Sequence, residues 1–406
     1  MTPTQQAHEP RAVAQRFASF GASIFAEMTR LAVHHGAVNL AQGFPDFDGP
    51  DFIRDAAMQA MREGHNQYCQ LAGIPPLTHA LADAWSARTG QRRDPSTEVT
   101  VTAGCTEALA ATFLGLINPG DEVILFDPSY DSYPAYAQMA GATVRWVPLR
   151  PPAPGAPDDA PFTFDEGDLR RAFTDRTKAI LINTPHNPTG KVFSRDELAL
   201  IASLCARHNA IAITDEVYER LTFDPALPHI SPATIPGLED RTVALSSLGK
   251  TFSFTGWKIG WAIAPRRLTE GLRAAHQHLI FCVATPFQHA AAAAIRAAEQ
   301  YQPTLNAEYR ERRDFLRAAL QRLGFRVFAT PGTYFVYADH SPFGFPDDVA
   351  FCKHLTENVK VAALPPSVLY HDKAEGLRMA RFAFCKRMPT LQEGVRRLEA
   401  GLRAGS

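Results

Sequence analysis

The feature that most constrains the fold is an alternation of strand-like and helical segments over the first two thirds of the chain. Helical periodicity falls near residues 51–64, 75–88, 104–117, 131–140 and 194–207. Short apolar runs typical of buried strands lie near 98–102, 122–127, 143–147, 178–182, 210–214, 242–246 and 258–264. This order predicts an α/β fold with a mostly parallel sheet of the seven-stranded type, sandwiched by helices.

The last third of the chain has a different pattern. From about Gln288 an alanine-rich stretch leads into a long charged helix near 303–323, and a smaller α+β unit closes the chain. Because 406 residues are too many for one small core, two subdomains are expected. The proline-rich stretch Arg150–Pro161 predicts an exposed loop rather than a domain linker.

Lys250 lies in a glycine- and serine-rich turn, SSLGKTFSFTGWK, directly after the apolar run Thr242–Leu245. A lysine amine can condense with an aldehyde as a Schiff base. Hydroxyl groups, loop amides and Lys258 would suit a phosphate. The combination predicts a cofactor that carries both an aldehyde and a phosphate. The alternative is a surface turn with two solvated lysines, since lysines are mostly exposed.

Asp215 follows the apolar run Ala210–Thr214, and Tyr218 comes three residues later. Ligands of open α/β sheets bind beyond the carboxyl ends of the strands. A carboxylate there can pair with a protonated pyridine nitrogen, and the tyrosine can donate to a ring phenolate oxygen. The alternative is that Asp215 caps a following helix, which is a common role for aspartate.

A stiff loop, NTPHNPTG at 183–190, follows the apolar run Thr177–Ile182. Its X-Pro steps restrict the preceding residues to extended conformations, so Asn183 and Asn187 are presented in fixed directions. Asn187 could donate to the ring oxygen opposite Tyr218. Taken alone, the loop would fit an ordinary proline-rich turn equally well.

Five motifs together resemble the fold-type I, class I aminotransferases that depend on pyridoxal 5'-phosphate. They are NLAQGFPDFDGP (39–50), FDPSYDSYPAY (126–136), NTPHNPTGKVF (183–193), SSLGKTFSFTGWK (246–258) and PGTYFVYAD (331–339). The resemblance runs from about Asn39 to Arg403 and is strongest to the subgroup of methionine and kynurenine aminotransferases (glutamine transaminase K). It implies a large cofactor-binding domain at 46–290 and a small domain at 291–406, packed with the N-terminal segment 1–45.

The resemblance also implies a set of cofactor residues. Lys250 corresponds to the Schiff-base lysine that moves the proton, Asp215 to the partner of the pyridinium, and Tyr218 and Asn187 to the donors at the ring oxygen. Further cofactor residues are Asn183, the phosphate-binding Gly104, Cys105, Thr106, Ser247 and Lys258, and Tyr130, which stacks on the ring. Tyr68 corresponds to a tyrosine that reaches the phosphate of the neighbouring subunit, so a homodimer with shared active sites is expected.

The substrates implied by the resemblance are an α-amino acid and a 2-oxo acid. Arg381 corresponds to the arginine that binds the α-carboxylate, for which its fork of donors is suited. Asn187 is expected to contact the substrate too. Gly43 corresponds to a loop that closes over the substrate, Phe25 to a tryptophan of the kynurenine enzymes, and Phe281 to an aromatic residue contributed across the dimer interface.

A neutral thioether or aromatic donor, methionine first, is the expected substrate. The segment Ala274–Pro286, which would reach across the interface, contains no arginine or lysine to meet a distal carboxylate. Burying such a carboxylate without a partner is costly. His276 and His278 weaken the expectation slightly, because either could charge and admit an acid.

Other classes of function are disfavoured by composition and motifs. A formal net charge of −1 does not suggest a nucleic-acid surface. The start of the chain lacks an apolar signal core and no window could span a bilayer, so a cytoplasmic protein without membrane contact is expected. The six cysteines form no C-x-x-C pair, and no H-E-x-x-H spacing occurs, so no metal is expected.

Three alternatives on the same scaffold remain open from the sequence. The first is an aminotransferase of the kynurenine or glutamine type. A cysteine-S-conjugate β-lyase would use the same Cα carbanion to expel a leaving group. A regulatory protein that senses the cofactor would carry a DNA-binding module ahead of the fold, but only some forty residues precede the NLAQGFPDF motif.

Overall fold

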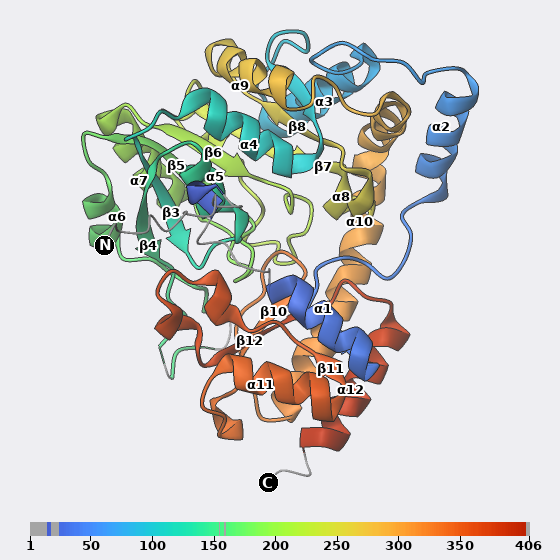
Figure 1. Ribbon diagram of the computed structural model, residues 1–406, viewed down its shortest axis with the longest axis vertical. Helices are drawn as coiled ribbons and strands as arrows, with labels where there is room; N and C mark the ends of the chain where they lie inside the picture. The colour runs from blue at the N-terminus through green and yellow to red at the C-terminus, as the bar shows by residue number, and fades with distance from the viewer. Residues whose placement is uncertain (1–13, 18–23, 154, 158–159, 403–406) are drawn as a thin grey trace, which may run out of the picture.

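The computed structural model describes residues 14–17, 24–153, 155–157 and 160–402 (Figure 1), with the backbone alone for Gln15 and Phe25. Within these residues the central sheet has seven strands in the order β2-β8-β7-β6-β5-β3-β4. β8 is antiparallel to β2 and β7, and the other neighbours pair in parallel. The strands are β2 (Val99–Thr102), β3 (Glu122–Asp127), β4 (Thr143–Pro148), β5 (Thr177–Asn183), β6 (Ile211–Asp215), β7 (Thr242–Ser247) and β8 (Gly260–Ile263). The predicted α/β fold is therefore confirmed.

Apolar side chains cover both faces of this sheet, because successive side chains along each strand point to opposite faces and most of them are apolar. In β3, Val123 and Leu125 pack with one core cluster, and Ile124 and Phe126 with another. Strands buried on both faces read as continuous apolar runs, which is why they could be predicted. The first cluster includes α4 (Gly104–Leu116), α5 (Ser132–Met139) and α9 (Arg266–Leu279), and the second includes α6 (Glu166–Ala172) and α7 (Arg195–His208).

Some elements differ from those predicted. Helices α6 and α9 were not predicted, because α6 is short and α9 is rich in charged residues, with Leu268 and Leu272 as buried contacts. β8 begins at Gly260 rather than at 258, since Lys258 adopts a left-handed backbone with φ of +54°. The other predicted helices are α2 (Asp51–Arg62) and α3 (Pro75–Thr89), which end within two residues of their expected limits.

A single long helix, α10 (Thr285–Arg322), connects the two parts of the molecule. The charged helix predicted near 303–323 therefore begins much earlier, and Pro303 lies inside it. Residues of α10 contact α2 and α3 at one end, and β9, β10 and α12 at the other (Figure 1). The helix crosses the domain boundary predicted near residue 290, so the limits 1–45, 46–290 and 291–406 stay a prediction.

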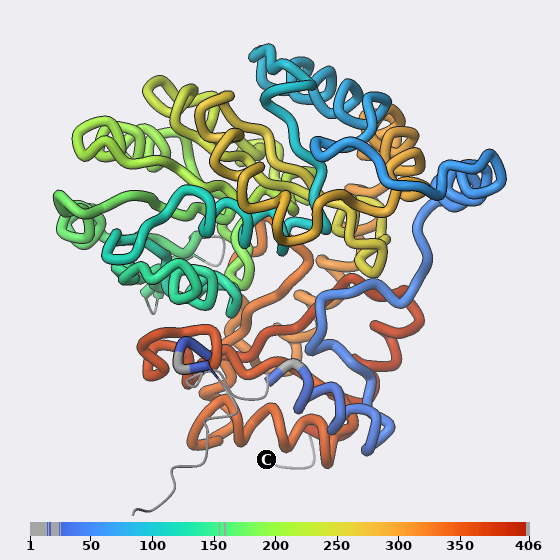
Figure 2. The backbone as a smooth tube through the Cα atoms, turned by 45° about the horizontal axis from the view of Figure 1, so that its top comes forward, coloured from blue at the N-terminus to red at the C-terminus, as the bar shows by residue number. Residues whose placement is uncertain are grey.

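The C-terminal part contains an antiparallel sheet in the order β12-β10-β9, which carries Arg381. A separate pair joins β1, in the N-terminal segment, to β11 in parallel. Figure 2 shows the blue helix α1 beside the red C-terminal part, in agreement with its contacts to β11. The elements are α1 (Ile24–His35), β1 (Val38–Asn39), β9 (Arg326–Val327), β10 (Phe335–Asp339), α11 (Asp348–His354), β11 (Val361–Ala362), β12 (Met379–Ala383) and α12 (Met388–Leu402).

Among the described residues, no helix combines the length and the apolar character needed to cross a membrane.

Candidate active site

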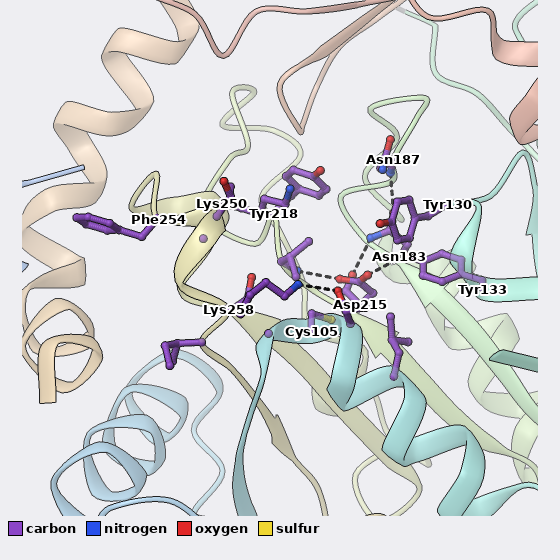
Figure 3. A pocket seen from close by; sticks show the side chains of 18 residues that line it. Cys105, Tyr130, Tyr133, Asn183, Asn187, Asp215, Tyr218, Lys250, Phe254 and Lys258 are labelled. Atoms are coloured by element: carbon purple, nitrogen blue, oxygen red, sulfur yellow. Dashed lines mark hydrogen bonds between the residues drawn. The ribbon is translucent and has the colours of Figure 1, made fainter. Parts of the chain in front are cut away.

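A cavity of about 170 Å³ lies where strands β5, β6 and β7 end (Figure 3). These strands finish at Asn183, Asp215 and Ser247, so their last side chains meet at one edge of the sheet. The predicted cofactor residues that line the cavity are Gly104, Cys105, Thr106, Tyr130, Asn183, Asn187, Asp215, Tyr218, Ser247, Lys250 and Lys258. Lining residues that were not predicted include Tyr133, Phe254 and Thr255.

Lys250 lies on the short helix α8 (Leu248–Thr251), which begins directly after β7. Its Nζ is 5.8 Å from the ring centroid of Tyr218 and 5.7 Å from that of Tyr334. Burial lowers the pKa of the Lys250 amine, whereas the nearby Asp215 raises it. An amine with a lowered pKa is more often neutral near pH 7 and therefore more nucleophilic. The alternative of two solvated lysines does not hold for Lys250, whose side chain is partly buried, whereas Lys258 is exposed.

Asp215 is 5% exposed, and both of its carboxylate oxygens accept hydrogen bonds. The Tyr133 hydroxyl donates to Oδ2 at 2.7 Å, and the backbone N–H of Val217 donates to Oδ1 at 3.2 Å. Burial raises the pKa of Asp215, and these two donors counteract that effect. Residues 217–220 form turns, so Asp215 does not cap a helix there. The carboxylate is held in place and lines the cavity.

The start of α4 and Lys258 form a cradle suited to a phosphate. Lys258 Nζ donates to Thr106 Oγ1 at 3.0 Å. Gly104 has φ of +71°, and a β-carbon there would lie 3.0 Å from Lys258 Nζ. A β-carbon on Gly260 would lie 2.4 Å from the carbonyl carbon of Gly104, so both glycines permit a close approach. A helix N-terminus with an adjacent cation and hydroxyl favours an anion.

Asn187 connects the cavity to Arg381. Asn183 Oδ1 accepts from the Asn187 backbone N–H at 2.6 Å, and Asn187 Oδ1 accepts from Arg381 Nη1 at 3.0 Å. Arg381 is 1% exposed and is not among the described cavity-lining residues. Its Nη2 donates to the Ala41 carbonyl at 3.0 Å, and its guanidinium lies 4.0 Å from the Phe335 ring centroid. Burial lowers the pKa of Arg381.

Gly43 lies against the same residues. The Tyr334 hydroxyl donates to its carbonyl at 2.6 Å, and a β-carbon on Gly43 would come within 2.5 Å of the Phe335 ring. Any larger residue would therefore push the segment 41–44 away from these aromatic rings. The Phe25 side chain, expected to contact the substrate, lies outside the described residues.

Tyr68 and Phe281 are not brought to the cavity of their own chain. They are 86% and 44% exposed, and their rings meet edge to face with centroids 5.8 Å apart. Cys69 and Cys282, the residues that follow them, are half-buried thiols. The remaining cysteines are buried: Cys105, Cys205, Cys352 and Cys385.

His276 does not face the cavity. It is fully buried, with Nδ1 3.1 Å from Glu107 Oε1 and Nε2 3.0 Å from the Leu71 carbonyl oxygen. Because its side chain is fully buried and both ring nitrogens have partners, His276 is not placed to contact a substrate carboxylate in this conformation. His278 is exposed.

Among the described residues, one group of side chains has the spacing of metal ligands. Glu216, Glu219 and His229 place their ligand atoms within 4.8 Å of one another. Arg88 forms ion pairs with both carboxylates, however, and His229 Nε2 lies 2.8 Å from Glu216 Oε2. These contacts satisfy the charges without an ion, and the absence of a metal stays a prediction.

The model of the family described as "Aminotransferase class I and II" matches residues 36–398. The chain belongs to the class I and II aminotransferases. A probable N-succinyldiaminopimelate aminotransferase of Mycobacterium tuberculosis is 46% identical over 94% of this chain and 97% of its own length. The Escherichia coli methionine aminotransferase is 39% identical, over 93% and 95%. Kynurenine–oxoglutarate transaminase 1 of Rattus norvegicus is 38% identical, over 96% and 97%.

Solved structures of other class I and II aminotransferases have the same fold. The N-succinyldiaminopimelate aminotransferase of M. tuberculosis superposes with a TM-score of 0.91, at 46% identity, over 96% of this chain and all of that one. The chain is an aminotransferase, and its cofactor is pyridoxal 5'-phosphate. The cavity fits that group, because it combines a lysine amine for the aldehyde, a buried carboxylate for the ring nitrogen and a cradle for the phosphate.

Proposed function

We propose that this aminotransferase moves the α-amino group of a neutral thioether or aromatic amino acid, methionine first, to a 2-oxo acid. The observation that carries this proposal is the chemistry of the segment 274–286. The His276 side chain is buried and hydrogen-bonded within its own chain, and His278 is exposed. The exposed large apolar side chains of the segment are Leu279, Ile280 and Phe281, of which Phe281 contacts Tyr68. A thioether or an aromatic ring gains from burial against such side chains. The identity with the E. coli methionine aminotransferase supports the same class of donor.

The proposed roles of the residues follow from their positions. Pyridoxal phosphate, when bound, supplies an electron sink that acidifies the Cα proton of the amino acid. The amine of Lys250 would hold the cofactor aldehyde. Once the amino group of the substrate has displaced it, the freed amine would accept the Cα proton and deliver it again. Asp215 would hold a proton on the ring nitrogen, while Tyr218 and Asn187 donate to the ring oxygen. The fork of Arg381 would bind the α-carboxylate.

The role of Lys250 can be tested directly. Reduction of the holoenzyme with borohydride should attach the cofactor permanently to Lys250, as peptide mapping by mass spectrometry would show. The matched control is Lys258, which also lines the cavity but is bound to Thr106. A label on Lys258 or Lys191 in place of Lys250 would reject the assignment.

A second candidate donor is N-succinyldiaminopimelate, favoured by the 46% identity with the M. tuberculosis relative. Next to its reacting carbon this compound has an unbranched apolar stem, as methionine has, and its additional carboxylates lie further away. The same apolar side chains could therefore accept the stem. The two candidates differ in what the distal end of the site must bind.

A side-by-side comparison of kcat/KM separates the candidates. Methionine, phenylalanine, kynurenine, N-succinyldiaminopimelate and aspartate would each be offered with one 2-oxo acid at saturation. The proposal expects methionine or phenylalanine well above aspartate, and above N-succinyldiaminopimelate. The second candidate replaces the first if N-succinyldiaminopimelate is the best donor. Pyruvate released from cystathionine in parallel would reveal β-elimination.

We also propose that the active form is a homodimer in which Tyr68 and Phe281 complete the partner's site. Tyr68 is 86% exposed although it contacts Phe281, and an exposed aromatic pair of this kind is expected where a subunit contacts its partner. Two-fold association would repeat each contact. The cytoplasmic location likewise stays a prediction.

A further inference from the structure

A buried pair, Glu107 and His276, lies next to the proposed phosphate cradle without lining the cavity. Glu107 is in the first turn of α4 and is 7% exposed, and His276 is in the last turn of α9 and is fully buried. The two helices lie side by side (Figure 1), and their backbones nearly touch at Gly115 and Gly271. The pair therefore joins two helices that cannot easily shift against each other.

Glu107 caps the turn that begins α4. Its Oε2 accepts from the backbone N–H of Ala103 at 3.2 Å. Ala103 occupies the N-cap position, where alanine has no side chain that could accept a hydrogen bond. Gly104, Cys105 and Thr106 follow directly. The carboxylate thus fixes the turn from its inner side.

His276 extends the connection to the two segments expected at the subunit interface. Its Nε2 bonds to the Leu71 carbonyl at 3.0 Å, three residues beyond Tyr68. Its own carbonyl accepts from the N–H groups of Ile280 and Phe281, at 3.1 and 3.2 Å. One side chain and its backbone therefore contact both segments.

The hydrogen bonds fix the number of protons that the pair holds. The Leu71 carbonyl only accepts, so His276 Nε2 must carry a hydrogen. Glu107 Oε2 accepts from Ala103, so it carries none. One proton must therefore lie between His276 Nδ1 and Glu107 Oε1, whichever of the two atoms holds it. In either arrangement the pair has no net charge, so the desolvation cost of burying it is smaller than that of burying a single charge.

We propose that Glu107 and His276 are positioning residues for the cofactor phosphate: they hold the Ala103–Thr106 turn in its anion-binding geometry against the interface segments. The inference rests on the proposed phosphate site. It predicts that the pair controls the affinity for the phosphate group, although neither residue touches the cofactor.

The test compares two substitutions of one residue. Glu107→Gln keeps every hydrogen bond, because the amide oxygen can accept from Ala103 while the amide N–H donates to a neutral His276. Glu107→Leu has a similar volume and removes both bonds. The dissociation constants of pyridoxal phosphate and of pyridoxal would be measured on each apoenzyme by fluorescence quenching. Circular dichroism melting would check that each variant is folded.

We expect Glu107→Leu to weaken binding of pyridoxal phosphate by about tenfold, the size of a lost helix cap, and binding of pyridoxal by less than about twofold. Glu107→Gln should stay within about twofold of the wild type for both. An unchanged affinity of Glu107→Leu for pyridoxal phosphate, or an equal loss for both compounds, would overturn the proposal.

Two further results keep the test decisive. If Glu107→Leu does not fold, His276→Phe takes its place, since it keeps the Ala103 bond but removes the contact with Leu71. The same selective loss for pyridoxal phosphate is expected, and an unchanged affinity would reject the role of the pair. If the wild-type enzyme binds pyridoxal as tightly as pyridoxal phosphate, the phosphate site itself is misplaced and the role of the pair fails with it, whereas the proposed amino donor is tested separately by the kcat/KM comparison.

Discussion

At the scale of single residues, the charge on Asp215 is the property on which the proposed chemistry depends most. The substitution Asp215→Asn keeps the size of the side chain but replaces a charged partner of the ring nitrogen with a neutral one. We expect kcat to fall by about a hundredfold or more, equivalent to about 3 kcal/mol. Cofactor occupancy, measured by absorbance after dialysis, should change far less. Turnover near that of the wild type would contradict the role of Asp215.

Tyr133 gives a second prediction at this scale, one about pH. Its hydroxyl lowers the pKa of Asp215 against the effect of burial. In Tyr133→Phe the carboxylate should therefore take up a proton at a higher pH than in the wild type. Because the charged form is the active one, the acid limb of the kcat/KM profile should move to higher pH. Tyr136→Phe, on the same helix, is the matched control, because in the described part of the chain the Tyr136 hydroxyl forms no hydrogen bond with the Asp215 carboxylate. A shift of equal size in Tyr136→Phe would exclude a specific effect of Tyr133.

Single residues also mark the limit of what the sequence reveals. Lys250 and Asp215 could be predicted because each follows an apolar strand at the edge where ligands bind. The Tyr133–Asp215 bond joins residues 82 positions apart, and the Glu107–His276 contact joins residues 169 positions apart. No local pattern encodes such partners, since they depend on how separate elements pack.

At the scale of elements, the loop between β5 and α7 contains a buried histidine. His186 is 2% exposed, and burial lowers its pKa from 6.5 to about 3. The unfolded chain therefore binds a proton between pH 6.5 and 3 that the folded chain does not, so stability falls as the pH decreases through this window. The contribution lost by pH 5 is about 2 kcal/mol.

Replacing this histidine should remove that pH dependence. His186→Gln can still bond to Thr189, which is 2.9 Å from Nδ1 in the wild type. Urea unfolding at pH 7 and pH 5 should show a smaller loss of free energy in the variant than in the wild type. An exposed histidine, as in His79→Gln, serves as the control. Equal losses in the wild type and His186→Gln would show that His186 does not couple folding to protonation.

Elements differ in how well the sequence predicts them. The strands of the central sheet lie within two residues of their predicted limits, because burial on both faces gives continuous apolar runs. The start of helix α10 was predicted wrongly, because its alanine-rich first half lacks the separate polar and apolar faces that mark an amphipathic helix. Helix α9 was not predicted because only two large apolar residues, Leu268 and Leu272, mark its buried face.

At the scale of the whole molecule, the proposed dimer can be tested by mixing two defective chains. Lys250→Ala removes the reactive amine, and Tyr68→Phe removes a hydroxyl expected at the partner's phosphate. In a mixed dimer, one site would combine an intact Lys250 with an intact Tyr68 from the other chain. Activity should therefore rise on mixing and exchange, toward about a quarter of the wild-type value for random association of equal amounts.

The controls for this mixture are equally specific. Lys250→Ala mixed with the double variant Lys250→Ala/Tyr68→Phe should remain inactive, because no chain then supplies the amine. Sedimentation at the assay concentration should show dimers in every sample. A mixture of the two single variants that is no more active than the sum of its parts would rule out shared sites.

The position of Cys69 and Cys282 has a practical consequence. These half-buried thiols follow Tyr68 and Phe281, whereas the other cysteines are buried, with Cys105 in the wall of the cavity. Their labelling therefore reports on association. A thiol-reactive dye would label Cys69 and Cys282 in a dissociated subunit, and would label them more slowly when a partner covers this surface. The rate of labelling would then measure the rate at which the two subunits dissociate, without any mutation or added tag.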